Sequence, residues 1–243
     1  MQHVKKLRSF IKRDRITRCF LVIQTLNYGV FLSLDIIEKG VIVSHLVKFL
    51  IILICFFYVN IKPSKHMIWR VALFFTVLSD FLLLLKDDYY LVGVSSFIIV
   101  QYLYGLYLSS LLYSTKSYRK KMFIRLIIIC VVTTIISYIL FLKSIYIDLL
   151  LISSIFYFLI ISNNFLIAIK ALRKNLHKTD VFLFTIGIFL FLLCDINVGI
   201  YNMSYYVDLP HLASNYIKSI SHILIWFFYA PSQVLISISS TYS

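Results

Sequence analysis

The chain is a series of long apolar runs separated by short polar connections. A helix needs roughly 20 mainly apolar residues to cross the hydrocarbon core of a bilayer. The strands of a membrane β-barrel alternate apolar and polar residues, whereas these runs are continuous. The sequence therefore predicts an all-α, polytopic membrane helix bundle with eight transmembrane helices. We expect these spans at residues 16–34, 41–59, 67–86, 90–113, 122–142, 146–170, 180–203 and 219–239.

The composition points to the same class. Of the 243 residues, 61% are hydrophobic and 14% are charged, whereas a soluble domain averages about 45–50% apolar and about 25% charged residues. The connections are too short to hold a soluble catalytic or nucleotide-binding domain. We expect a basic N-terminal segment, residues 1–15, followed by one membrane domain, residues 16–243, whose function is carried out within the membrane or at its surface.

The positive charge is distributed in a way that reports topology. The net charge of +14 would suggest a nucleic-acid partner in a soluble protein. Here 19 of the 24 Lys and Arg residues fall in every second connection, including the N-terminal segment. Cytoplasmic connections of membrane proteins are rich in Lys and Arg. The pattern predicts an integral membrane protein with both termini in the cytoplasm and no nucleic-acid partner, and the short connections suggest a bacterial-type plasma membrane.

Two carboxylates interrupt the apolar runs. Asp80 lies in the third predicted span and Asp195 in the seventh. A charge at the centre of a membrane helix costs about 2.5–3.5 kcal/mol on insertion scales, so such a residue is a functional candidate. At about 1.5 Å per residue, Asp80 lies about 20 Å and Asp195 about 22 Å from the cytoplasmic ends of their helices. The two carboxylates are therefore expected at a similar depth.

The surroundings of the two aspartates are alike. Residues 74–80 and residues 189–195 share a pattern of aromatic and aliphatic residues that ends in a small residue and Asp. The two aspartates are 115 residues and four spans apart. Because four is even, repeated halves would have the same orientation in the membrane. Two parallel four-helix halves are one arrangement that this pattern allows.

Other polar residues of the spans could join the aspartates in one polar cavity. They include Lys48, Gln101, Asn202, His222 and Gln233. Structural roles are also open: Lys48 could pair with either aspartate to hold helices together, and the two glutamines could link helices by hydrogen bonds. His222 could be a solvated residue at the membrane surface. Since no His, Cys and carboxylate residues have ligand spacing, we expect no metal and no cofactor.

These residues resemble those of the YhhN-like integral membrane proteins, which include lysoplasmalogenases. Members have eight spans, a Ser/Gly-Asp pair in span 3 and a Ser-Asp pair in span 7. Ser79-Asp80 matches the first pair. Cys194-Asp195 matches the second pair, with Cys in place of Ser. The resemblance covers about residues 40–240.

Three further elements carry the resemblance. Lys48-Phe49-Leu50 is similar to a Lys-Pro-Leu element of span 2, without its proline. Tyr229 and Gln233 match a Tyr-x-x-x-Gln pattern of the last span. Gln101 stands where many members have His in span 4.

The resemblance implies an activity: hydrolysis of the vinyl ether bond of a lysoplasmalogen to a fatty aldehyde and a glycerophospho-head group. Asp80 and Asp195 would then be the catalytic acid and base, and the partners would be a lipid substrate and the bilayer. The residues expected to bind substrate are Lys48, Gln101, Asn202, His222, Tyr229 and Gln233.

Two other classes of function remain open from the residues alone. Paired intramembrane carboxylates with a lysine also suit a proton-coupled or cation-coupled transporter of a small or lipid-like substrate. A receptor or scaffold could hold the same residues as a structural cluster.

Overall fold

The computed structural model describes His3, Leu7, Ser9 and Ile11, and residues 14–37, 39–62, 67–86, 88–113, 115–206 and 211–242. In this part of the chain, eight helices are long and apolar enough to cross a membrane, which confirms the predicted class and an integral membrane protein. The eight helices are α2 (Arg15–Ile37), α3 (Val41–Ile61), α4 (Met67–Leu85), α5 (Tyr90–Leu112), α6 (Thr115–Leu142), α7 (Leu149–Lys174), α8 (Thr179–Asn202) and α9 (His211–Thr241).

Each predicted span overlaps one helix. The largest differences are at the starts of α6 and α9, which begin about two turns before the predicted spans. Helices of this length extend past the hydrocarbon core, so their polar first turns continue the helix where an apolar run has already ended. Most basic residues of segment 1–15 lie outside the described residues.

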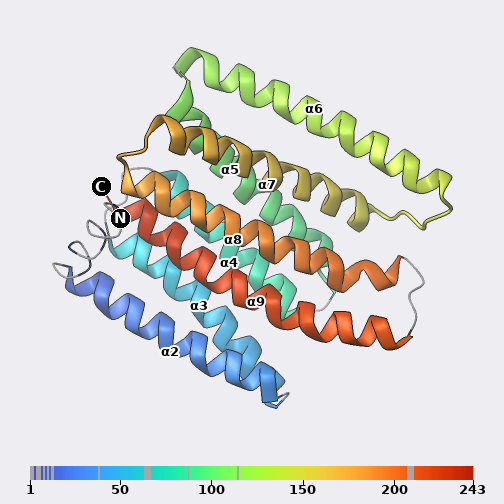
Figure 1. Cartoon of the computed structure of the whole chain (residues 1–243), viewed down its shortest axis with the longest axis horizontal. Helices are drawn as coiled ribbons and strands as arrows, with labels where there is room; N and C mark the ends of the chain where they lie inside the picture. The colour runs from blue at the N-terminus through green and yellow to red at the C-terminus, as the bar shows by residue number, and fades with distance from the viewer. Residues whose placement is uncertain are drawn as a thin grey trace.

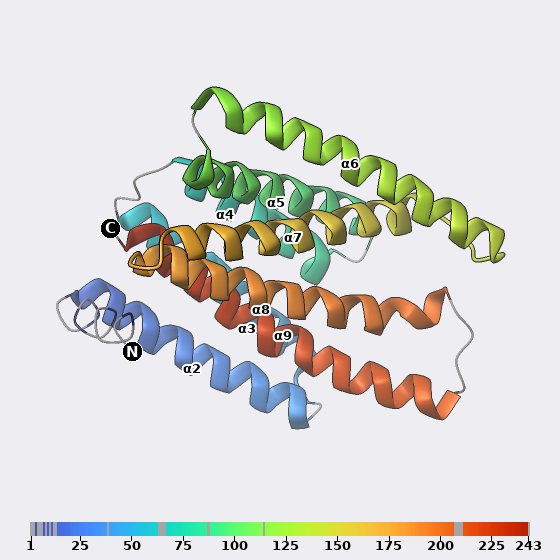
Figure 2. The same cartoon turned by 45° about the horizontal axis from the view of Figure 1, so that its top comes forward.

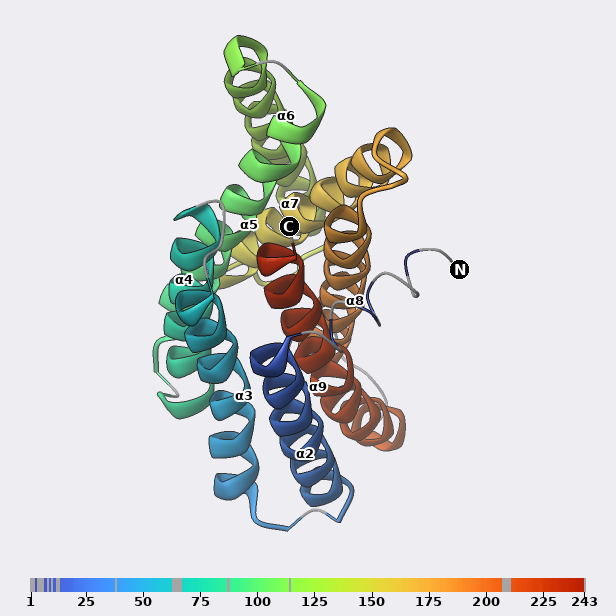
Figure 3. The same ribbon diagram turned by 90° about the vertical axis from the view of Figure 1, so that its left-hand side faces the viewer.

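The helices form a ring with two attachments. Packing runs from α3 to α4, α5, α7, α8, α9 and back to α3. Helix α2 packs outside the ring against α3 and α9, and α6 packs outside it against α5 and α7 (Figures 1 and 3). Figure 2 shows α6 at one edge of the bundle and α2 at the other. The interior of the ring is therefore enclosed by helices from both parts of the sequence.

The packing supports two parallel halves. The first half consists of α2 to α5 and the second half of α6 to α9, in corresponding order. If each helix is replaced by its counterpart in the other half, every packed pair becomes another packed pair. Trp69 of α4 and Phe184 of α8 are 115 residues apart, like the two aspartates. Their rings meet edge to face in the centre, with centroids 5.1 Å apart. The repeated sequence pattern thus corresponds to a repeated arrangement of helices.

Two features of α9 fit it into the ring. A Cβ atom on Gly187 of α8 would lie 2.7 Å from Cγ1 of Ile236, so only a glycine lets α8 and α9 approach this closely. Pro231 lies inside α9 and has no N–H, which leaves the carbonyl of Phe227 without its helical donor. The Tyr28 hydroxyl of α2 donates to that carbonyl at 3.2 Å.

The two ends of the chain lie at one end of the bundle (Figure 1). There Asp14 forms an ion pair with Lys62, and Thr17 bonds to the Tyr58 hydroxyl at 2.8 Å. Tyr58 also bonds to the Thr241 hydroxyl at 2.9 Å, which ties the last turn of α9 to α2 and α3. Partial burial lowers the pKa of the Lys62 ammonium below its usual value. That this end faces the cytoplasm remains a prediction from the charge distribution.

Candidate functional site

Asp80 lies on the inner side of α4 and is held by a tyrosine. Its side chain accepts a hydrogen bond from the Tyr229 hydroxyl of α9 at 2.7 Å, and only 3% of the residue is exposed. The preceding Ser79 donates to the Gly93 carbonyl of α5 at 2.7 Å. Three helices therefore fix the position of this carboxylate. The structure brings together Asp80 and Tyr229, which sequence analysis had selected separately.

Asp195 of α8 is held in the same manner from a different direction. It accepts a hydrogen bond at 2.8 Å from the hydroxyl of Tyr157 on α7. Sequence analysis missed Tyr157, because the chain has 18 tyrosines and no motif distinguishes this one.

Aromatic rings surround the two tyrosine–aspartate pairs. The Phe97 ring lies 5.9 Å from the Tyr157 ring and 6.2 Å from the Tyr229 ring, measured between centroids. Phe191 lies 5.7 Å from Phe97 and 5.3 Å from Tyr229. Both carboxylates thus belong to one aromatic interior, in which electrostatic interactions are stronger than in water.

Gln101 links α5 and α7 next to this interior. It is fully buried, and the Asn164 amide donates to its backbone carbonyl at 2.7 Å and to its Oε1 at 3.1 Å. The Gln101 side chain interacts with Tyr157, yet its Nε2 has no well-formed hydrogen bond within the described residues. Gln101 therefore joins helices, as one interpretation of the sequence proposed, and also presents a buried donor beside the Asp195 pair.

Lys48 is paired with a carboxylate that sequence analysis did not consider. Its Nζ lies 2.8 Å from Oδ2 of Asp35, and the Ser44 hydroxyl donates to Oδ1 of Asp35 at 2.5 Å. The suggestion that Asp80 or Asp195 pairs with Lys48 is thus wrong. Asp35 was missed because the first span was expected to end at residue 34. Helix α2 continues to Ile37, and a turn at Gly40, with φ of 67°, brings Asp35 back against α3.

Aromatic rings also enclose the Lys48 ammonium. Its Nζ lies 5.8 Å from the centroid of the Phe31 ring and 5.4 Å from that of Trp226. Cation–π attraction is strongest where water is excluded, and Lys48 is fully buried. The Trp226 ring also meets the Tyr229 ring edge to face at 5.1 Å. Trp226 therefore separates the Lys48–Asp35 pair from the Tyr229–Asp80 pair.

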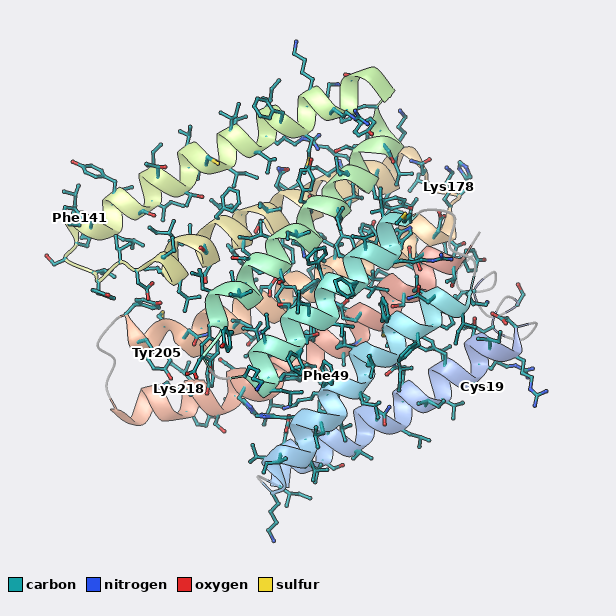
Figure 4. All side chains as sticks on the ribbon, turned by 180° about the vertical axis from the view of Figure 1, so that it is seen from behind. Cys19, Phe49, Phe141, Lys178, Tyr205 and Lys218 are labelled. Carbon is teal, nitrogen blue, oxygen red and sulfur yellow. The ribbon has the colours of Figure 1, made fainter. Side chains whose placement is uncertain are left out.

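A cavity opens on the other side of the Lys48–Asp35 pair. It has a volume of about 330 Å³ and lies between the ends of α2, α3, α8 and α9. Figure 4 shows Lys218, one of its lining residues, beside Tyr205 and at the opposite end of the molecule from Cys19 and Lys178. The polar residues that line the cavity include Asp35, Lys39, His45, Lys218, Ser219 and His222.

The structure separates the remaining predicted residues. His222 lines the cavity and does not contact the aspartates by any described hydrogen bond. Asn202 lies at the end of α8, where its amide donates to the Val198 carbonyl at 2.9 Å. Gln233 is fully buried in α9, and its Oε1 has no hydrogen-bond donor among the described residues.

A ring of six apolar helices, with two more packed outside it, encloses tyrosine-bonded carboxylates and defines an integral membrane protein with a polar site inside the bundle. The model of the YhhN family matches residues 43–240, and the chain belongs to this family. The matched region contains Asp80, Asp195 and Lys48, whereas Asp35 lies before it. Searches of curated proteins and of solved structures found no match to the chain.

Proposed function

We propose that this protein hydrolyses the vinyl ether bond of lysoplasmalogens. The YhhN family generally includes lysoplasmalogenases. The observation that carries the proposal is the pair of tyrosine-bonded aspartates, Asp80 with Tyr229 and Asp195 with Tyr157, on facing helices of one aromatic interior. A single-chain lipid is a substrate that can approach such an interior from the bilayer.

The two carboxyl groups supply what the reaction needs. One aspartate, in its neutral form, gives a proton to the β-carbon of the vinyl ether, and the α-carbon becomes an oxocarbenium ion. The other aspartate, ionised, stabilises that cation and removes a proton from the water that adds to the α-carbon. As the resulting hemiacetal breaks its bond to the glycerol oxygen, the second aspartate gives its proton to that oxygen and the first takes the proton of the hemiacetal hydroxyl. The fatty aldehyde and the glycerophospho-head group are released, and both aspartates return to their starting states.

The surrounding residues position these groups. The Tyr229 and Tyr157 hydroxyls each fix one carboxylate, so the acid and the base do not rotate away from the substrate. Aromatic faces stabilise a cation and exclude unproductive water. Gln101 Nε2 and Gln233 Oε1 are buried amide atoms that have no well-formed hydrogen bond within the described residues. These amides can hold the attacking water or a glycerol oxygen.

The test is aldehyde release from lysoplasmenylethanolamine by the purified protein in detergent. We expect turnover by the wild type and a loss of at least about 100-fold in Asp80→Asn and in Asp195→Asn, as for removal of a general acid or base. Asp88→Asn is the matched control, because Asp88 is an exposed aspartate just outside α4. Unfolding temperatures of all variants would separate loss of chemistry from loss of fold.

Two outcomes would contradict the proposal. Absence of aldehyde with a folded wild type would remove the hydrolase assignment, and pH-dependent uptake into vesicles would then favour a transporter. Equal losses in Asp88→Asn would show that the effect is not specific to the intramembrane pair. The structure favours the enzyme over a transporter in one respect: α4 and α8 are continuous helices through Asp80 and Asp195, whereas transporter sites commonly use broken helices.

A further inference from the structure

The cavity has more positive charge than membrane topology explains. Lys39, Lys86, Lys143 and Lys218 are the basic residues assigned from the sequence to the connections opposite the termini. Lysines are scarce on that side in membrane proteins generally, because positive charge favours the cytoplasmic side. Lys39 and Lys218 nevertheless line the same cavity. Lys39 comes from the α2–α3 connection and Lys218 from α9, so membrane topology does not explain why they line the same cavity.

The charges of the lining do not cancel. Asp35 is the acidic lining residue. Its charge is neutralised by Lys48, which does not line the cavity and whose Nζ lies 2.8 Å from Oδ2 of Asp35. The ammonium groups of Lys39 and Lys218 remain on the cavity side. A site with this surplus of positive charge selects an anion, and ammonium groups with neighbouring hydroxyls, such as that of Ser219, suit a phosphate.

The volume of the cavity suits a head group and not a whole lipid. Its volume of about 330 Å³ is at the lower end of the range for small-molecule sites, roughly 300–1,000 Å³. Leu34, Val41 and Ile223 form an apolar part of the wall. A polar head group could thus occupy the basic part while the lipid chain continues along the bundle.

We propose that this cavity binds the phosphodiester head group of a lysophospholipid. The inference rests on the proposed function, because it identifies the site that holds the polar end of the same substrate. His222 of the cavity and Tyr229 of the Asp80 pair are seven residues apart on α9. They therefore lie on one face and about 10 Å apart along the helix axis.

The length of the substrate matches this spacing. Seven covalent bonds separate the phosphorus atom from the β-carbon of the vinyl ether in a lysoplasmalogen. An extended chain advances about 3.6 Å per three bonds, so the separation is about 8 Å. A phosphate beside His222 thus places the vinyl ether near the level of Asp80. Trp226 lies between these levels on the same helix, so the glycerol passes beside its ring.

A kinetic experiment tests the site with two substrates. Lysoplasmenylethanolamine has the phosphate, whereas a 1-alkenylglycerol has the same vinyl ether without it. We expect the Lys39→Gln/Lys218→Gln double variant to lower the ratio of kcat/KM for the first substrate over the second by at least tenfold. Lys86→Gln is the matched control, because Lys86 is an exposed lysine on the same side and outside the cavity. An unchanged ratio in the double variant would overturn the inference.

A binding experiment tests the site without catalysis. Lysophosphatidylethanolamine, which has an ester-linked chain, should bind to the wild type in nanodiscs and at least tenfold more weakly to the double variant. Binding of a monoacylglycerol should not change. Equal affinity of the wild type for both lipids would contradict the head-group site. Binding of free glycerophosphoethanolamine as tightly as the lipid would show that the occupant is a free phosphodiester, which would overturn the assignment to a lysophospholipid. Binding as expected without aldehyde release would support the cavity and remove the hydrolase, so the two proposals can fail separately.

Discussion

The two halves of the bundle have an aspartate at equivalent positions, but the two aspartates differ in burial and in the source of their hydrogen bond. Asp80 is 3% exposed and receives its hydrogen bond from Tyr229, which belongs to the other half. Asp195 is less completely buried and receives its hydrogen bond from Tyr157, which belongs to its own half. Acid–base chemistry needs two carboxyl groups in different protonation states. A repeated scaffold with unequal surroundings is a direct way to provide them.

The charged pair adds a second difference between the halves. In the first half, Asp35 of α2 neutralises Lys48 of α3. The corresponding helix of the second half, α6, contains no Asp or Glu in its sequence. The first half thus has a buried ion pair between its outer helix and α3, whereas the outer helix of the second half has basic residues but no carboxylate that could form one. The comparison teaches that two halves with the same arrangement of helices have different buried polar contacts.

The largest effect is expected from breaking the ion pair of the first half. Lys48→Met or Asp35→Asn leaves one buried charge without its partner, so each should destabilise the protein by about 3–5 kcal/mol. The Lys48→Met/Asp35→Asn double variant should recover most of that loss. Unfolding curves in denaturant measure all three variants. If the losses of the single variants simply add in the double variant, the two residues are not coupled.

The next effect separates the two tyrosines. Tyr229→Phe and Tyr157→Phe each remove one hydrogen bond to a carboxylate, worth about 1.5–3 kcal/mol. In the transition state that corresponds to a fall in kcat of about 10- to 100-fold. The dependence of kcat on pH tests this further. Each variant should shift only one side of the curve, acidic or basic, and the two variants should shift opposite sides. Tyr138→Phe on the exposed face of α6 is the control, and a shift of the same side by both tyrosine variants would refute distinct roles.

A smaller effect compares the packing of the halves. Gly187→Ala adds a Cβ 2.7 Å from Ile236 and should destabilise the protein by about 1–3 kcal/mol. Gly199→Ala is the matched control in the same helix, because no atom lies within 4 Å of its added Cβ. The first half has Ala72 at the position equivalent to Gly187. Thermal unfolding that is equal for both glycine variants would show that the close approach of α8 to α9 does not matter.

The smallest effect concerns Pro231 of α9. The corresponding helix of the first half, α5, has no proline. Tyr28→Phe should destabilise the protein by about 1 kcal/mol, because the Phe227 carbonyl loses its donor. In a Pro231→Ala background a backbone N–H can take that place, so the same substitution should have almost no effect. A double-mutant cycle of unfolding free energies measures the coupling. Equal effects in both backgrounds would contradict this explanation.

Much of the fold could be predicted from the sequence because hydrophobic length determines the spans. The outward and inward faces of the helices could not, since lipid is as apolar as a protein core and no polar face marks the exterior. Gln24, which interrupts the first span, illustrates the point: it donates to the Ile51 carbonyl of α3 at 2.9 Å and faces inward.

The candidate site was predictable only in part for the same reason. Asp80 and Asp195 stand out in an apolar run, and Tyr229 lies in a motif. Tyr157 and Trp226 are ordinary aromatic residues among many, so only the packing of the helices reveals their contacts. Asp35 could have been found from its spacing to Lys48 around Gly40, had the first span been extended by one turn.

The closed ring has a consequence for how the protein is made. Helix α3 completes its packing only when α9 has been synthesised, about 180 residues later. At about 5–20 residues per second, that delay is roughly ten to forty seconds. The Lys48–Asp35 pair joins neighbouring helices of one hairpin, so the lysine can insert into the bilayer already neutralised. The Tyr229–Asp80 hydrogen bond needs α9, so we expect it to form after the Lys48–Asp35 pair.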